Sequence, residues 1–240
     1  MGMPITIEVV DRAVSPSMVE EVFCYFDYVD QKFSTYKDAS EISKINRQEI
    51  KIAEYSQDMQ EVLRLCEETK KETNGFFDIV AKDGAYDPSG LVKGWAIYKA
   101  AQLVQTKGVK NFYIDAGGDI QACGQNNHGE FWRVGIRNPF NQEEIVKVVA
   151  LQNKGMATSG TYIRGQHIYN PYNKNQEITD IVSLTIIGAN VYEADRFATA
   201  AFAMGKQGIE FVEQKLGLEG YIIDKNGLAT MTSGFNKYVI

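Results

Sequence analysis

Asp195 and Thr199 stand four residues apart in a segment whose apolar residues recur at helical spacing. That separation stacks the two side chains on one face of a helix. Carboxylate and hydroxyl oxygens are ligands that a hard cation such as Mg²⁺ accepts, and Mg²⁺ often takes only one or two of them from the protein. The pair alone leaves two alternatives open, a metal site and the ordinary polar side of a helix start. Three glycine-rich segments upstream add weight to the metal site.

The composition indicates an ordinary globular protein. At 240 residues, with 44% hydrophobic and 11% aromatic residues, the chain can bury a sizeable core. We expect a single domain over residues 1–240, with two closely packed subdomains as the alternative. A formal net charge of −6 and the lack of a long Lys/Arg block argue against a nucleic-acid partner. An acidic protein can still bind an anion locally through backbone N–H groups.

The cysteines and the hydropathy pattern indicate a compartment. Cys24, Cys66 and Cys123 are odd in number and far apart, which predicts buried thiols in a reducing environment. The first residues lack a basic segment followed by an apolar one, and no apolar run reaches about 18 residues. We therefore expect no membrane span and a cytoplasmic location.

Hydrophobic periodicity divides the chain into helices and strands. Helices are predicted from Ser15 to about Phe33, from Ser56 to Asn74, from about Val92 to Thr106, and from about Tyr192 to Met204. Strands are predicted over residues 5–9, 111–116, 131–136, 145–151, 182–187, 220–223 and 228–232, with a hairpin turn at 224–227. The central run of strands without intervening helices favours an α+β fold with largely antiparallel sheet over a doubly wound parallel fold.

The polar segment 34–46 follows the first long helix and restarts a short one, capped by Ser40 or Asp38. Taken alone, it is most simply a connection between helices. The functional alternative is that Tyr36, Lys37 and Asp38 present a ring, a cation and an acceptor to one ligand.

The segment from Asp87 to Trp95 has Pro88 and Gly90 in front of a predicted helix that carries Lys93 in its first turn. Free N–H groups at a helix start, together with a lysine, suit an anion such as a diphosphate. An ordinary capped turn with a solvated lysine explains the same residues equally well. Neither a Walker loop nor G-x-G-x-x-G occurs, so the usual nucleotide-binding folds lose support.

Two further segments lie between predicted strands. Gly117-Gly118 most simply forms a turn, and its missing side chains would also clear space for a ligand. Hydroxyls and a glycine at residues 158–160 stand at a strand end. His128 occupies a solvated turn, whereas His167 lies beside an apolar segment, where a neutral imidazole could act as a general base or be purely structural.

Taken in order, these segments resemble the ApbE family of FAD:protein FMN transferases. The resemblance rests on Met1-Gly2, Ser34-Thr35-Tyr36, Ser40 to Ser43, Asn46, Gly75 to Asp78, Asp87 to Gly94, Gly117 to Ile120, Thr158 to Gly160, His167 to Pro171 and Ala194 to Thr199. It implies an ApbE-like, T-fold-related α+β architecture. It also implies a Mg²⁺-dependent enzyme that splits the diphosphate of FAD, moves FMN onto a threonine hydroxyl of an acceptor flavoprotein, and releases AMP.

The resemblance assigns roles residue by residue. The metal would be held by the backbone carbonyl of Gly90 and the side chains of Asp195 and Thr199. FAD would contact Met1, Tyr36, Lys37, Asp38, Asp78, Asp87, Lys93, Gly118, Thr158, Ser159 and Gly160. His167 would be the base, with Lys93 and Asp195 as the other catalytic residues.

Two departures from the family pattern limit this transfer. Only the short segment from Ile79 to Tyr86 separates Asp78 from Asp87, where the family usually has a longer insertion, so part of the adenine-side wall is expected to be missing. Many relatives are exported lipoproteins, whereas this chain shows no such signal, so we expect a cytoplasmic or cytoplasm-facing acceptor. Two other functions are the alternatives. One is an FAD pyrophosphatase giving FMN and AMP, and the other is a non-catalytic FAD-binding protein.

Overall fold

The computed structural model describes residues 2–12, 15–161 and 168–240. Its helices are α1 (Pro16–Phe33), α2 (Glu41–Asn46), α3 (Gln57–Glu72), α4 (Ser89–Thr106), α5 (Val191–Ala203) and α6 (Gly208–Glu213), with short 3₁₀ turns η1 (Ile52–Glu54), η2 (Gly205–Gln207) and η3 (Phe235–Tyr238). Its strands are β1 (Ile5–Val9), β2 (Phe112–Ala116), β3 (Asp119–Cys123), β4 (Trp132–Asn138), β5 (Asn141–Leu151), β6 (Lys154–Gly160), β7 (Tyr169–Asn170), β8 (Asn173–Glu177), β9 (Ile181–Gly188), β10 (Glu219–Asp224) and β11 (Ala229–Met231).

Seven strands form one sheet in the order β1-β2-β3-β6-β9-β10-β11, and every neighbouring pair is antiparallel. The hairpin β4–β5 is inserted between β3 and β6, and the small hairpin β7–β8 between β6 and β9. The wholly antiparallel sheet confirms the predicted α+β class.

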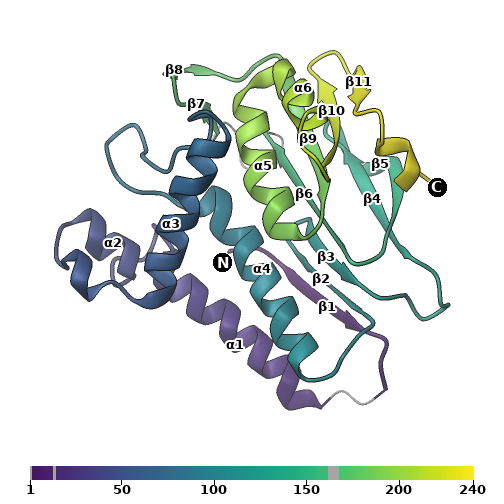
Figure 1. Cartoon of the computed structure of the whole chain (residues 1–240), viewed down its shortest axis with the longest axis horizontal. Helices are drawn as coiled ribbons and strands as arrows, with labels where there is room; N and C mark the ends of the chain where they lie inside the picture. Colours follow the sequence, from purple (N-terminus) through teal and green to yellow (C-terminus); the bar gives the residue numbers. More distant parts are fainter. Residues whose placement is uncertain (1, 13–14, 162–167) are drawn as a thin grey trace.

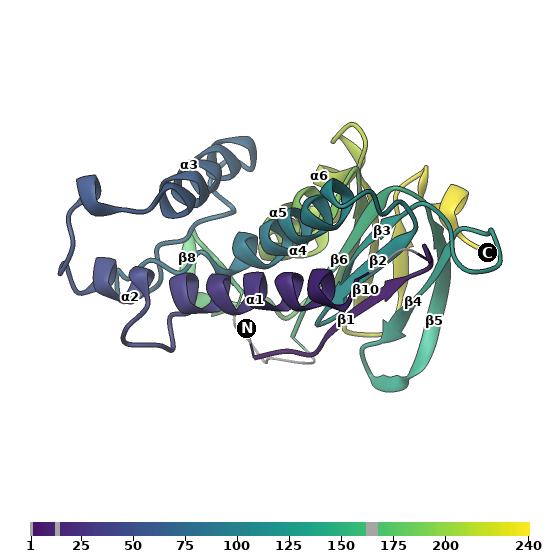
Figure 2. The same cartoon turned by 90° about the horizontal axis from the view of Figure 1, so that it is seen from below.

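The molecule has three layers, which are clearest from below (Figure 2). Helices α1, α4, α5 and α6 cover one face of the sheet, and β4–β5 covers the other. One apolar cluster joins α1, α3 and α4 to β1 and β2, a second lies between α5 and the sheet, and a third lies between the sheet and β4–β5. Helices α2 and α3 extend away from the sheet (Figure 1).

The spacing of buried residues explains why these segments are helices. In α1 the buried residues recur every three or four positions, which is the inward stripe of an amphipathic helix. Helix α5 is buried on nearly all sides because it lies between α4 and the strands β6 and β9. A polar residue in α5 therefore faces protein or a cavity rather than solvent.

The predicted elements lie close to the observed ones, with differences at their ends. Helix α4 begins at Ser89 rather than near Val92, and β3 and β6 form full strands where the sequence indicated only strand ends. The hairpin at 224–227 is confirmed, and Ser40 caps α2 by accepting the Ser43 N–H.

The expectation of three buried thiols is wrong for Cys24, which is exposed on α1. Within the described ranges, the helices lack the combined length and apolar character that crossing a bilayer requires.

Glu41, the first residue of α2, connects α2 to α1 and α3 through hydrogen bonds. Its carboxylate accepts from Lys32 Nζ at 2.9 Å near the end of α1. It also accepts from the backbone N–H and the hydroxyl of Ser56, both at 2.7 Å, at the start of α3. Burial opposes ionisation here, but the bonds from Ser56 and Lys32 outweigh it and leave the pKa of Glu41 below its ordinary value of 4.5.

We expect Glu41→Gln to lower the free energy of unfolding by about 2 kcal/mol at neutral pH, because bonds to a charged carboxylate are lost. The folded-state pKa lies below that of the unfolded chain, so this stabilisation is complete above pH 4.5 and disappears as pH falls through the folded value. Urea unfolding at neutral and acidic pH measures both effects. Glu68→Gln, which breaks an exposed pair with Arg64, is the control and should change little. A Glu41→Gln deficit that persists in acid would mean that packing, not charge, was lost.

Candidate functional site

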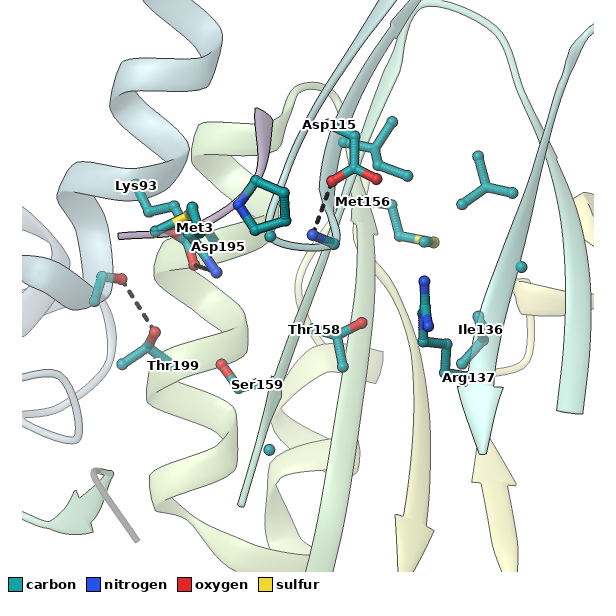
Figure 3. Close-up of a pocket in the computed structure, with 18 of the residues that line it drawn as sticks. Met3, Lys93, Asp115, Ile136, Arg137, Met156, Thr158, Ser159, Asp195 and Thr199 are labelled. Carbon is teal, nitrogen blue, oxygen red and sulfur yellow. Dashed lines mark hydrogen bonds and ion pairs between the residues drawn. The ribbon is translucent and has the colours of Figure 1, made fainter. Parts of the chain in front are cut away.

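A cavity of about 1130 Å³ lies where the helical layer, the main sheet and the β4–β5 hairpin meet. Its lining includes Gly90, Lys93, Asp195 and Thr199 from the helices. From the strands and turns come Asp115, Gly118, Thr158, Ser159, Gly160 and Arg137. Figure 3 shows Lys93, Asp195 and Thr199 together on one side and Arg137 projecting from β4 on the other. The topology therefore brings residues from five separate segments of the chain to one site.

Two glycines one helical turn apart allow α5 to lie directly against α4. A Cβ on Gly94 would be 2.5 Å from the Cβ of Asp195 and 2.8 Å from the carbonyl oxygen of Val191. A Cβ on Gly90 would be 2.8 Å from Cγ2 of Thr199. Without these glycines, the helices could not approach closely enough to bring Asp195 and Thr199 against the backbone of α4.

Hydrogen bonds fix both side chains in this contact. The Gly94 N–H donates to Oδ2 of Asp195 at 2.7 Å, and the hydroxyl of Thr199 donates to the carbonyl of Gly90 at 3.0 Å (Figure 3). The sheet fixes the start of α5, because the Val191 N–H donates to the side chain of Gln121 in β3 at 2.9 Å. Asp195 and Thr199 are thus held by the backbone of α4 while they line the cavity.

Lys93 lies between two buried carboxylates. Its Nζ is 2.5 Å from Oδ2 of Asp119 and 4.0 Å from Oδ1 of Asp195. The side chains of Asp119 and Asp195 are 1% and 5% exposed, and that of Lys93 is 15% exposed. One ammonium group therefore faces two carboxylates, which leaves excess negative charge in a region largely shielded from water.

Burial affects the titration of two aspartates that line the cavity, Asp195 and Asp115. Burial raises the pKa of Asp195, the ammonium of Lys93 opposes that rise, and the neighbouring Asp119 adds to it. Burial likewise raises the pKa of Asp115, although Asp115 Oδ1 accepts the Gly118 N–H at 2.8 Å. An added cation would be favourable here because it would offset the excess negative charge.

The β2–β3 turn places Asp119. Gly117 and Gly118 have φ of 61° and 91°, and they connect paired residues Ala116 and Asp119 as a two-residue hairpin turn. Asp119 Oδ1 accepts the backbone N–H of Thr158 in β6 at 3.1 Å. The structural role predicted for the two glycines is confirmed, and their turn directs a buried carboxylate toward α4.

The segment from Asp78 to Asp87 forms another wall. Asp78 pairs with Lys70 at 3.0 Å, and its other oxygen accepts the Val80 N–H at 3.1 Å. The side chain of Asn46 bonds both the N–H and the carbonyl of Tyr86, at 2.8 Å and 3.0 Å. Asn46 thereby fixes the chain immediately before Asp87, which gives this residue a positioning role that the sequence did not reveal.

The predicted anion site at the start of α4 does not form as expected. Because α4 starts three residues earlier than predicted, Lys93 lies beyond the first turn, where it pairs with Asp119. At the helix start, Asp87 Oδ1 accepts the Ser89 N–H at 3.0 Å, so a carboxylate of the chain already occupies that amide. Lys93 nevertheless lines the cavity and can still face a ligand there.

Three predicted FAD contacts are not part of the cavity lining. Tyr36 is 97% exposed, Lys37 pairs with Asp30 at 2.5 Å, and the backbone carbonyl of Asp38 accepts from Arg47. These residues lie in the connection between α1 and α2, as predicted for the segment taken alone. Their place in the FAD site stays a prediction. Two other predicted residues, Met1 and His167, lie outside the described residues.

Sequence reasoning missed Asp119 as a site residue. The available signal was an aspartate directly after Gly-Gly at the start of a strand whose five residues are all buried. His128, expected in a solvated turn, is exposed and also lines the cavity.

The residues present fit a hard divalent cation. The carboxylate of Asp195, the hydroxyl of Thr199 and the carbonyl of Gly90 are oxygen donors that border one cavity. Among the described residues, no group of three or more His, Cys, Asp and Glu is arranged so that it could hold a metal ion. A metal at this site would therefore depend on hydroxyl and carbonyl oxygens beside a single carboxylate, as Mg²⁺ tolerates.

Curated proteins named FAD:protein FMN transferase are similar to this chain. It is 30% identical over 150 residues to the FAD:protein FMN transferase of Escherichia coli K12, covering 59% of this chain and 43% of that protein. It is 28% identical over 159 residues to the Haemophilus influenzae protein of the same name, covering 61% of this chain and 46% of that protein. The matched region thus spans less than half the length of these curated relatives.

Solved structures show the same fold at lower sequence identity. Flavin transferase ApbE from Vibrio cholerae superposes with a TM-score of 0.86 at 21% identity, covering 99% of this chain and 96% of that one. The ApbE protein of Thermotoga maritima gives 0.87 at 20% identity, with the same coverage. The ApbE family model matches residues 1–84 and 80–222. The chain therefore belongs to the ApbE family.

Proposed function

We propose that this protein transfers FMN from FAD to a threonine hydroxyl of an acceptor flavoprotein in a Mg²⁺-dependent reaction that releases AMP. The observation that carries the proposal is the contact of α4 with α5, which sets Asp195, Thr199 and the Gly90 carbonyl at one cavity beside Lys93. The relatives named FAD:protein FMN transferase support the same reaction.

The transfer exchanges one phosphorus–oxygen bond for another. The bond between the FMN phosphorus and the oxygen bridging to AMP breaks, and a bond from the acceptor oxygen to that phosphorus forms. The hydroxyl proton goes to a base, for which His167 is our candidate, and AMP leaves with the bridging oxygen. Positioning and charge neutralisation carry most of the catalysis in such transfers.

The chain's own groups meet these demands. A bound Mg²⁺, held by Asp195, Thr199 and the Gly90 carbonyl, would neutralise charge on the diphosphate. Lys93 supplies a second positive charge, fixed in direction by Asp119. Phe77 and Ile120 are buried residues of the lining, so they exclude water from part of the cavity and strengthen both interactions.

The experiment that tests this proposal incubates the purified protein with FAD, Mg²⁺ and a candidate acceptor flavoprotein. We expect the acceptor to gain the mass of FMN, with one AMP formed per acceptor modified, and a chelator to stop the reaction. An acceptor whose target threonine is replaced by valine is the control and should stay unmodified. Free FMN with AMP would instead identify an FAD pyrophosphatase. Bound but unchanged FAD would identify a binding protein, and either result would refute the proposal.

A further inference from the structure

Lys93 is shared unequally by two carboxylates that could each pair with it. Its Nζ is 2.5 Å from Asp119 but 4.0 Å from Asp195, although the two aspartates are similarly buried. Attraction between charges falls with distance, so Asp119 holds the ammonium more strongly. The unequal distances require a cause in the surrounding structure.

The cause lies in how firmly Asp119 is held. It follows the Gly117-Gly118 turn directly, and its Oδ1 accepts the Thr158 N–H of the neighbouring strand β6. Oδ2 is left to face Lys93, which reaches across from α4. Asp119 therefore connects the rigid sheet to a flexible lysine side chain at a fixed point.

Asp195 is the alternative partner for Lys93. Its Oδ2 is committed to the Gly94 N–H, and Oδ1 is the oxygen that faces Lys93 at 4.0 Å. If Lys93 moved onto Oδ1, its positive charge would occupy the oxygen that a divalent cation needs. Ammonium and cation would then compete for one carboxylate, because both are attracted by the same charge.

We propose that Asp119 is a positioning residue that holds Lys93 away from Asp195 and so keeps the Asp195 carboxylate open to a divalent cation. The inference rests on the metal site of the proposed function. It goes beyond that function because it gives a role to a residue that is not among the metal ligands or FAD contacts assigned above. Asp119 also interacts directly with the Asp195 carboxylate, so a double-mutant cycle is needed to isolate the part of its role that passes through Lys93.

The test measures binding of Mn²⁺, as a probe for Mg²⁺, by calorimetry on the full chain without FAD. Asp119→Asn keeps an acceptor for Thr158 but loses the charge, so Lys93 should move onto Asp195 and weaken Mn²⁺ binding about tenfold. Lys93→Gln removes the competitor and should bind Mn²⁺ at least as tightly as the wild type. In the double variant, Asp119→Asn should cost no affinity beyond Lys93→Gln alone.

Asp115→Asn is the matched control. Asp115 lines the same cavity, and the charge of Lys93 offsets part of the rise that burial causes in its pKa. Its Oδ1 accepts the Gly118 N–H at 2.8 Å, not an N–H of β6. Its neutralisation should change Mn²⁺ affinity much less than Asp119→Asn. Asp119→Ser provides a second uncharged variant, smaller than asparagine, in case asparagine prevents folding. Thermal unfolding of each variant reports its folded fraction.

The outcomes separate this inference from the proposed function. Wild-type Mn²⁺ affinity in Asp119→Asn or Asp119→Ser would overturn the role of Asp119 and leave the metal site standing. An equal loss of affinity in the Lys93→Gln background would also overturn it, because the effect would then not pass through Lys93. If the wild type bound no Mn²⁺, the metal site would fail, and the inference with it.

Discussion

Asp195→Asn is expected to lower the rate of Mg²⁺-dependent FMN transfer by about 10³-fold, the size of effect seen when a group that stabilises developing charge is removed. Asparagine keeps a carbonyl oxygen that can accept the Gly94 N–H at the site of Asp195 Oδ2. The substitution therefore removes the negative charge and leaves the contact between α4 and α5 in place. Lys93 then loses one of its two carboxylate neighbours but keeps Asp119.

Steady-state rates of AMP release, measured over a range of Mg²⁺ concentrations, check this expectation. Thermal unfolding of the same protein is the control, and it should be nearly unchanged or raised, since a buried carboxylate with a raised pKa is removed. Rates like those of the wild type at every Mg²⁺ concentration would show that Asp195 is not a metal ligand. A collapse of stability would show that its role is structural.

Gly94→Ala is expected to have the second-largest effect, on stability and activity together. The new Cβ would lie 2.5 Å from the Cβ of Asp195 and 2.8 Å from the Val191 carbonyl, so two helices must separate. Overpacking of this kind costs about 3 kcal/mol. The better helix propensity of alanine returns about 1 kcal/mol. We therefore expect a net loss of about 2 kcal/mol in the free energy of unfolding.

Gly90→Ala is the matched comparison, because it makes the same change one turn earlier in the same helix. Its Cβ would meet the end of the Thr199 side chain, which can rotate, and not helix backbone. Its loss of stability should be smaller, while Mg²⁺ dependence should still change because the Thr199 hydroxyl is displaced. Urea unfolding of both variants compares their losses of stability, and Mg²⁺ titrations of their activity compare their Mg²⁺ dependence. Equal stability of Gly94→Ala and the wild type would mean that α4 and α5 do not need the close approach.

Much of the fold could be predicted because its signals are local. The stripe of α1 and the turn at 224–227 depend on neighbours within a few residues, and both are confirmed. The start of α4 was misplaced because the helix begins at Ser89, before the apolar pattern does, where Asp87 accepts the Ser89 N–H. Strands β3 and β6 were incompletely recognised because they contain buried polar residues, such as Gln121 in β3 and Ser159 in β6, and because β6 also contains two glycines.

The candidate site was predicted only in part, because only some of its signals are local in sequence. Asp195 and Thr199 were recognisable because their spacing is that of one helix face, and they do line the cavity. Asp119 was not, because its importance lies in meeting Lys93, which is remote in sequence and comes from a different layer. The Tyr36 segment shows the reverse case. This loop has a ring, a cation and an acceptor that could bind a ligand, but it follows the end of α1 and does not line the cavity.

By itself the sequence determined which segments are helices and strands, which residues share a face, and which segments resemble the ApbE family, since these depend on spacing along the chain. Only the tertiary structure decided which carboxylate holds Lys93 and how closely α4 and α5 approach. Those facts depend on distances between residues far apart in sequence. Packing at Gly90 and Gly94 and the β2–β3 turn set these distances, and no local pattern encodes them.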